Sequence, residues 1–142
     1  MKIKIKNIFA EIIASLFIVI FGYTAITKLA EREAFLRTME RSPLLGGFSS
    51  FLSWFIPITE IAACFLLFFP QSRKRGILFS LFLLMALTLY LMYTLLYADH
   101  LLCSCGGVIS VFTWFEHLIF NLFLLALLVV ALFLQRKKSL LQ

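Results

Sequence analysis

The sequence predicts an all-α membrane protein: a four-transmembrane-helix bundle with a short amphipathic helix in the first extracytoplasmic loop. Hydrophobic residues make up 63% of the 142 residues and charged residues only 14%, a balance far from that of a soluble domain. Apolar runs close to the roughly 20 residues that cross a bilayer recur four times. Short basic clusters flank these runs. We therefore expect a single four-span membrane domain over residues 1–142.

The four spans are expected at about 8–28, 51–69, 76–98 and 114–134. Lys2, Lys4 and Lys6 precede the first apolar run, which therefore resembles a signal peptide. The run is too long for one, keeps Glu11 inside and lacks a small-x-small cleavage site, so we expect an uncleaved anchor. The short turn at 71–75 makes spans two and three an antiparallel hairpin.

Basic residues predict the orientation of the spans. They cluster at 2–6, 73–75 and 136–138, which fall on one side if the chain crosses four times. The positive-inside rule assigns that side to the cytoplasm. We expect a multi-pass protein of the bacterial inner (cytoplasmic) membrane with both termini in the cytoplasm. Because topology explains the net charge of +6, the lipid bilayer is an expected partner and nucleic acid is not.

The connection at 29–50 is then extracytoplasmic and contains a segment with helical periodicity. Between residues 31 and 41, Ala34, Phe35 and Met39 lie among charged residues at near-helical spacing. This pattern predicts a short amphipathic helix on the outer membrane surface. The helix either covers the bundle as a lid or merely connects two spans, and the sequence favours neither.

The connection at 99–112 carries two closely spaced cysteines, Cys103 and Cys105, followed by Gly106 and Gly107. A disulfide between them would close a very small ring and stabilise little. Short, exposed disulfides are labile and suit exchange with a partner thiol on the oxidising side of the membrane. Two alternatives remain: the cysteines are idle or permanently bonded, or they hold a soft ion such as Cu(I) together with His100.

Polar residues inside the spans form a second candidate site. Glu60 lies roughly 13 Å deep in span two, and a carboxylate at that depth indicates a functional site. Lys28, at the outer end of span one, is its expected partner. On span four, His117 and Asn121 share one face with Trp114. These residues form the polar wall of a pocket beneath the cysteines. Alternatively, Lys28 and Glu60 are a purely structural pair, or a protonated Glu60 donates a hydrogen bond to a neighbour.

Four residues on spans one and three are weaker candidates for the same wall: Thr24, Tyr90, Thr94 and Tyr97. Tyr93 points elsewhere if the others face inward. Cys64 lies one turn after Glu60, and a single cysteine in an apolar helix is usually a small core residue.

These residues resemble the MauE/DoxX-like redox-associated membrane proteins over about residues 8 to 134. The matching motifs are Gly22-x5-Lys28-Leu29 followed by Phe35, Pro57-x-x-Glu60, the basic turn, Cys103-x-Cys105-Gly106, and Trp114 with Asn121. The resemblance implies a four-helix membrane bundle, extracytoplasmic thiol-disulfide chemistry and a thioredoxin-like or cysteine-containing exported partner. It implies redox roles for Cys103 and Cys105, supported by Glu60, Lys28 and Asn121. Many members have Phe-Gly after Cys-x-Cys, whereas this chain has Gly106-Gly107. This departure from the family pattern bears on the choice of partner.

We therefore expect a thiol-disulfide oxidoreductase in which Cys103 and Cys105 exchange electrons with a partner thiol, with a quinone in the outer half of the bundle as candidate cofactor. His117 is the candidate for proton transfer because its unperturbed pKa lies near neutral pH. The candidate cofactor-binding residues are Glu60, Asn121, Lys28 and Trp114. The alternatives are a non-catalytic scaffold or accessory subunit of a transport or maturation complex, and a thiolate metal-binding module.

Overall fold

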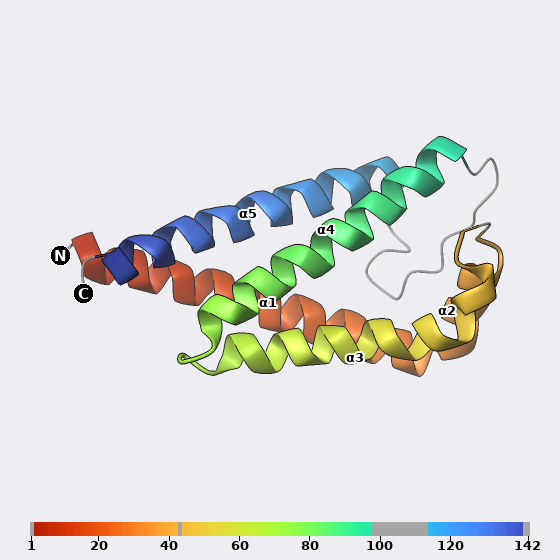
Figure 1. The fold of residues 1–142 in the computed structure, drawn as a ribbon, viewed down its shortest axis with the longest axis horizontal. Helices are drawn as coiled ribbons and strands as arrows, with labels where there is room; N and C mark the ends of the chain where they lie inside the picture. The colour runs from red at the N-terminus through yellow and green to blue at the C-terminus, as the bar shows by residue number, and fades with distance from the viewer. Residues whose placement is uncertain (1, 43, 98–113, 141–142) are drawn as a thin grey trace.

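The computed structural model describes residues 2–42, 44–97 and 114–140 (Figure 1). Its helices are α1 (Lys2–Ala30), α2 (Arg32–Glu40), α3 (Ser49–Phe68), α4 (Arg73–Tyr97) and α5 (Trp114–Leu140), and a 3-10 turn, η1 (Gly46–Phe48), leads into α3. No strand occurs in these ranges. The all-α fold class predicted from the sequence is confirmed.

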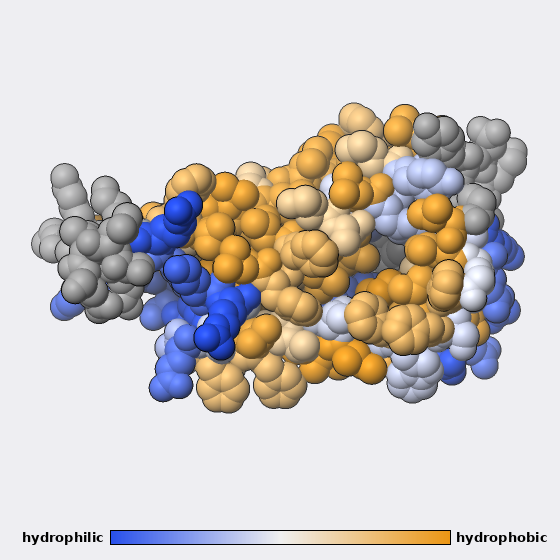
Figure 2. Space-filling view, viewed as in Figure 1, coloured by the Kyte–Doolittle hydropathy of each residue, from blue (hydrophilic) through white to orange (hydrophobic). Residues whose placement is uncertain are grey.

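Four helices, α1, α3, α4 and α5, are long and apolar enough to cross a membrane. Large apolar side chains such as Val19, Phe82 and Phe133 are exposed on their outer faces. Figure 2 shows these faces as an apolar band across the middle of the molecule, with hydrophilic residues gathered toward both ends. Exposed apolar surface of this extent suits contact with lipid. The chain is a multi-pass membrane protein.

The four long helices form a closed ring in which α1 packs against α3 and α5, and α4 packs against α3 and α5. Residues Phe17, Ala63, Leu67, Leu128 and Ala131 are almost fully buried where these helices meet. The small side chains among them let helix backbones approach closely, which stabilises membrane bundles. Both chain ends lie at one end of the bundle, and α2 lies at the other (Figure 1).

The turn between α3 and α4 is tight, and Gly76 makes it so. A Cβ atom at this position would lie 2.8 Å from the Leu66 carbonyl carbon and 2.9 Å from the Leu67 nitrogen, closer than real Cβ atoms approach backbone. The Ser72 hydroxyl donates to the Leu66 carbonyl oxygen at 2.9 Å, and this bond satisfies a carbonyl at the end of α3. Glycine at position 76 therefore sets the spacing of the hairpin.

An ion pair ties the start of α4 to α1 at the end of the bundle where both termini lie. The Arg73 guanidinium lies 3.4 Å from the Glu11 carboxylate. Glu11, which distinguishes the first apolar run from a signal peptide, therefore joins two helices here.

Within α3, Pro57 is buried three residues before Glu60. Proline has no backbone N–H, so the Ser53 carbonyl lacks the donor that an α-helix normally supplies. The helical backbone nevertheless continues from Ser49 to Phe68.

The apolar face of helix α2 packs against the helix bundle. Phe35 and Met39 are only 3% and 4% exposed and form a small core with Ile56 of α3. The opposite face is charged, and Glu33 and Arg37 lie 3.7 Å apart on it. The expected amphipathic helix forms, but its apolar side contacts the bundle instead of lipid.

Candidate functional site

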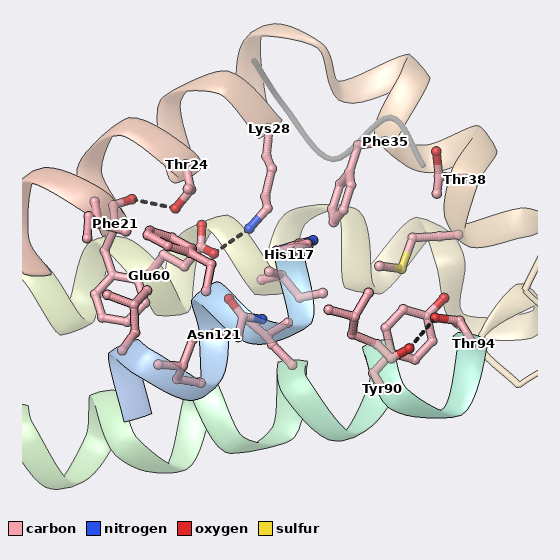
Figure 3. A pocket seen from close by; sticks show the side chains of 18 residues that line it. Phe21, Thr24, Lys28, Phe35, Thr38, Glu60, Tyr90, Thr94, His117 and Asn121 are labelled. Carbon is pink, nitrogen blue, oxygen red and sulfur yellow. Dashed lines mark hydrogen bonds and ion pairs between the residues drawn. The ribbon is translucent and has the colours of Figure 1, made fainter. Parts of the chain in front are cut away.

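A cavity of about 120 Å³ lies in the half of the bundle next to α2, and all five helices contribute to its wall. Most of the wall is apolar and comes from residues such as Phe21, Ile56, Leu84, Leu91 and Phe120. Figure 3 shows polar side chains from several helices turned toward this space. A mostly apolar cavity with a few converging polar groups is the usual form of a small-molecule site.

The Lys28 ammonium of α1 donates a hydrogen bond to Glu60 Oε1 of α3 (Figure 3). Both residues line the cavity and are buried, Lys28 at 9% and Glu60 at 1% exposed. The ammonium also lies 5.8 Å from the centre of the Phe35 ring, within range of a cation-π contact. The pairing expected from the sequence is present, and it leaves the wall with no net charge from these two groups.

The second carboxylate oxygen, Glu60 Oε2, is buried and has no hydrogen-bond partner within 3.5 Å among the residues that the structure describes, although the Thr24 side chain lies near enough to interact with the carboxyl group. A buried carboxylate oxygen without a donor is costly, because water no longer solvates it. The cavity that Glu60 lines is where a donor can be supplied. This oxygen is therefore the strongest indication that the cavity is a ligand-binding site.

Helix α5 brings His117 and Asn121 into the same cavity. They are four residues apart, so they lie one turn apart on one face of the helix. Asn121 is buried and His117 half-buried. The amide of Asn121 can both donate and accept hydrogen bonds, so it can bind carbonyl and hydroxyl groups alike.

Among the weaker candidates, Thr24, Tyr90 and Thr94 line the cavity. The Thr24 hydroxyl donates to the carbonyl oxygen of Phe21 at 3.2 Å, and the Thr94 hydroxyl donates to a carbonyl oxygen of its own helix at 2.8 Å. Tyr93 does not line the cavity. The side chains of Tyr97 and Trp114 lie outside the described part of the structure.

Helix α2 covers the cavity with Phe35, Thr38 and Met39. These residues follow the i, i+3, i+4 spacing of one helix face. Of the two roles left open by the sequence, this arrangement favours a lid over a mere connection. Sequence reasoning missed Thr38, and its spacing from Phe35 and Met39 is the signal that could have found it.

A family model described as "Methylamine utilisation protein MauE" matches residues 6–134. The chain belongs to the MauE family. The resemblance indicated by the sequence motifs is thereby confirmed. No curated protein and no solved structure matches the chain. All the residues that line the cavity, from Ile20 to Leu124, lie within the MauE match.

The cysteine pair expected to carry the chemistry of this MauE-family chain, Cys103 and Cys105, lies outside the described residues, as does His100. Cys64, the third cysteine, is half-buried in α3, and its thiol donates to the Ile18 carbonyl oxygen at 3.5 Å. Cys64 does not line the cavity. Within residues 2–42, 44–97 and 114–140, no group of three or more His, Cys, Asp or Glu residues could hold a metal ion.

The two points where the cysteine segment joins the bundle are described. The segment follows Tyr97 at the end of α4 and precedes Trp114 at the start of α5. Thr94 and His117, each three residues from one of these points, both line the cavity. The cavity is therefore adjacent to both attachment points of the segment that carries the cysteines.

Proposed function

We propose that this MauE-family protein exchanges electrons, through Cys103 and Cys105, with a thioredoxin-like or other cysteine-containing protein outside the cytoplasm. A partner thiolate attacks the Cys103–Cys105 disulfide, forms a mixed disulfide and releases one thiolate of the pair. The partner's second thiolate then attacks the mixed disulfide. The partner leaves oxidised and the pair is left reduced, with two electrons transferred. The reverse exchange forms and breaks the same bonds.

The observation that carries this proposal is the position of the polar cavity. Lys28, Glu60, His117 and Asn121 come from three helices and line one space, beside both ends of the segment that contains the two cysteines. Ionisable and polar groups inside a membrane bundle are costly and mark functional sites. The family match supports a membrane role for the whole chain.

In this proposal residues 1–142 act as a single four-span domain of the bacterial inner membrane. The exposed basic residues Lys4, Lys74, Arg75 and Arg136 belong to the helix ends near the two termini, and the positive-inside rule assigns that end to the cytoplasm. Helix α2 and the cysteine segment are then on the extracytoplasmic side. A disulfide persists on that side.

Trapping of a mixed disulfide tests this function. We expect Cys103→Ser or Cys105→Ser, expressed in native membranes, to accumulate a covalent complex with a cysteine-containing exported protein, because the resolving thiol is missing. The complex should disappear on treatment with a reductant. Cys64→Ser is the matched control and should capture nothing, because Cys103 and Cys105 are both retained and the mixed disulfide is resolved.

Failure of both variants to capture a partner, with a thiol state that neither oxidant nor reductant changes, would contradict the proposal and favour an accessory scaffold. Loss of bound copper in the same variants, with an unchanged thiol state, would instead indicate a thiolate metal site.

A further inference from the structure

The size of the cavity limits what can occupy it. Its volume is about 120 Å³. An engineered protein cavity of about 150 Å³ lined by apolar residues binds benzene. The space is therefore suited to one substituted six-membered ring, and its partly open form lets a tail extend out of it.

The apolar part of the wall selects a lipid-soluble molecule. The cavity is partly open and lies between spans whose outer faces suit contact with lipid, and isoleucine, leucine, methionine and phenylalanine make up ten of the eighteen residues that line it. Lys28 and Glu60 together contribute no net charge. A ligand with a full charge would be left unpaired there, so a neutral ring is favoured.

The polar part of the wall offers both donors and acceptors. The Lys28 ammonium has three N–H groups and donates one of them to Glu60 Oε1. The Asn121 amide can donate and accept, and Glu60 Oε2 is a buried acceptor with no partner in the described part of the chain. A carbonyl oxygen on the ligand can accept from Lys28 or Asn121, and a ligand hydroxyl can donate to Glu60 Oε2.

We infer that this cavity binds the ring of a lipid-soluble quinone and of its reduced quinol. Quinones carry ring carbonyl oxygens, and quinols carry hydroxyls in their place, so the mixed wall can hold both forms. The inference rests on the proposed function, because the quinone is the oxidant that regenerates the cysteine disulfide. The Cys103 and Cys105 thiols lose two electrons and two protons, and the S–S bond forms. The quinone takes up the two electrons and the two protons and becomes the quinol.

Ligand-dependent thermal unfolding tests the site. The full chain is purified in detergent, and its unfolding temperature is measured by circular dichroism with increasing decylubiquinone. We expect the unfolding temperature to rise with ligand concentration, because a ligand bound only by the folded state stabilises it. Decylbenzene, which has the ring and tail but no carbonyl oxygens, should bind at least tenfold more weakly.

Two variants on α4 form a matched pair. Leu87 lines the cavity and Leu89 is exposed on the lipid-facing side. Leu87→Phe fills space that the ring needs and should weaken decylubiquinone binding at least tenfold, whereas Leu89→Phe should leave it unchanged. Asn121→Leu, of similar size but without donors, should also weaken binding at least tenfold. If either cavity variant fails to fold, the comparison of decylubiquinone with decylbenzene on the natural chain still decides the outcome.

Equal stabilisation by decylbenzene, or unchanged decylubiquinone binding in Leu87→Phe, would overturn the inference. The same titration on the Cys103→Ser and Cys105→Ser single variants, which are the ones used to trap a partner, separates the inference from the proposed function. Decylubiquinone binding without any captured partner would contradict the thiol-disulfide proposal alone. A captured partner without decylubiquinone binding would contradict the quinone site alone.

Discussion

At the scale of single residues, Lys28 and Glu60 dominate the site. Removing a carboxylate and an ammonium from water is costly, and their mutual attraction offsets that cost only with good geometry and further hydrogen bonds. Glu60 Oε1 has its partner, and Glu60 Oε2 has none among the described residues. A pair that leaves one oxygen unsatisfied is poorly suited to stability alone, and this supports a role in binding.

Removing one member of the pair should destabilise the protein more than removing both. We expect Lys28→Met to lower the free energy of unfolding by about 3–5 kcal/mol, because it leaves the Glu60 carboxylate buried without its cation. The Lys28→Met/Glu60→Leu double variant should recover most of this loss. Unfolding of the purified protein in detergent measures both effects.

The exposed pair on α2 supplies the control for that measurement. Glu33 and Arg37 lie in water at 3.7 Å, where ion pairs contribute little. Glu33→Ala should leave stability nearly unchanged. A double variant as unstable as Lys28→Met would show that the two buried charges do not stabilise one another.

Sequence reasoning predicted the pairing of Lys28 with Glu60 because a deeply placed carboxylate needs a cation, and few are within reach. It also placed His117 and Asn121 on one helix face. It could not show that Glu60 Oε2 stays without a donor, because that depends on the distances between helices. Nor could it show that Thr38 joins the wall, because the direction of the α2 face depends on tertiary packing.

At the scale of the elements, α2 covers the cavity, and the α3–α4 hairpin sets the approach of two spans toward the opposite end of the bundle. Hydropathy predicted that α2 has an apolar face, but not whether that face meets lipid or protein, since both are apolar. Phe35 and Met39 meet Ile56, and the helix therefore covers the cavity. The sequence also could not predict the close approach of Gly76 to the backbone of α3, because sequence spacing alone does not place one backbone against another.

The two helical glycines at positions 76 and 22 should respond in opposite ways to the same change. Gly76→Ala places a Cβ 2.8 Å from backbone atoms of α3, and we expect it to destabilise the protein by about 1–3 kcal/mol, the usual cost of overpacking. A Cβ at Gly22 meets nothing within 4 Å. Gly22→Ala should therefore be neutral or slightly stabilising. Equal unfolding temperatures for the two variants would contradict the close contact in the hairpin.

Truncating the lid should expose the cavity to water. In a variant in which all three native cysteines are serine, Thr24→Cys places a thiol in the cavity wall. We expect Phe35→Ala to raise the rate at which a water-soluble maleimide labels this thiol at least tenfold, because the ring that covers the space is gone. Glu33→Ala, on the exposed face of α2, is the matched control. An unchanged labelling rate in Phe35→Ala would show that α2 does not close the cavity.

At the scale of the whole molecule, the ring of four long helices has two chemically different ends. The end with both termini carries the three basic clusters, and the other carries the cavity and α2, in which arginines are balanced by glutamates (Figures 1 and 2). The sequence predicted the number of helices well, because each backbone polar group in a membrane must be satisfied within a helix. The cavity depends on how five helices pack together, and the number of helices alone could not predict it.

The proposed orientation can be measured with impermeant labels. In intact cells with the outer membrane permeabilised, a membrane-impermeant maleimide should label Glu33→Cys on α2 and leave Lys74→Cys in the α3–α4 turn unlabelled. The background again has serine at the three native cysteines. Inverted membrane vesicles should give the reverse pattern. Labelling of Lys74→Cys from outside would place the termini on the extracytoplasmic side and remove the basis of the redox proposal.

Pro57 has a consequence for how a guest molecule enters the bundle. One backbone hydrogen bond is missing from α3 three residues before Glu60, so the helix can pivot there without breaking another. Such a hinge would move Ser53 and Ile56 while Ala63 and Leu67 stay fixed deeper in the core. A ligand would then reach the cavity when α3 bends at Pro57, and the other helices would keep their packing.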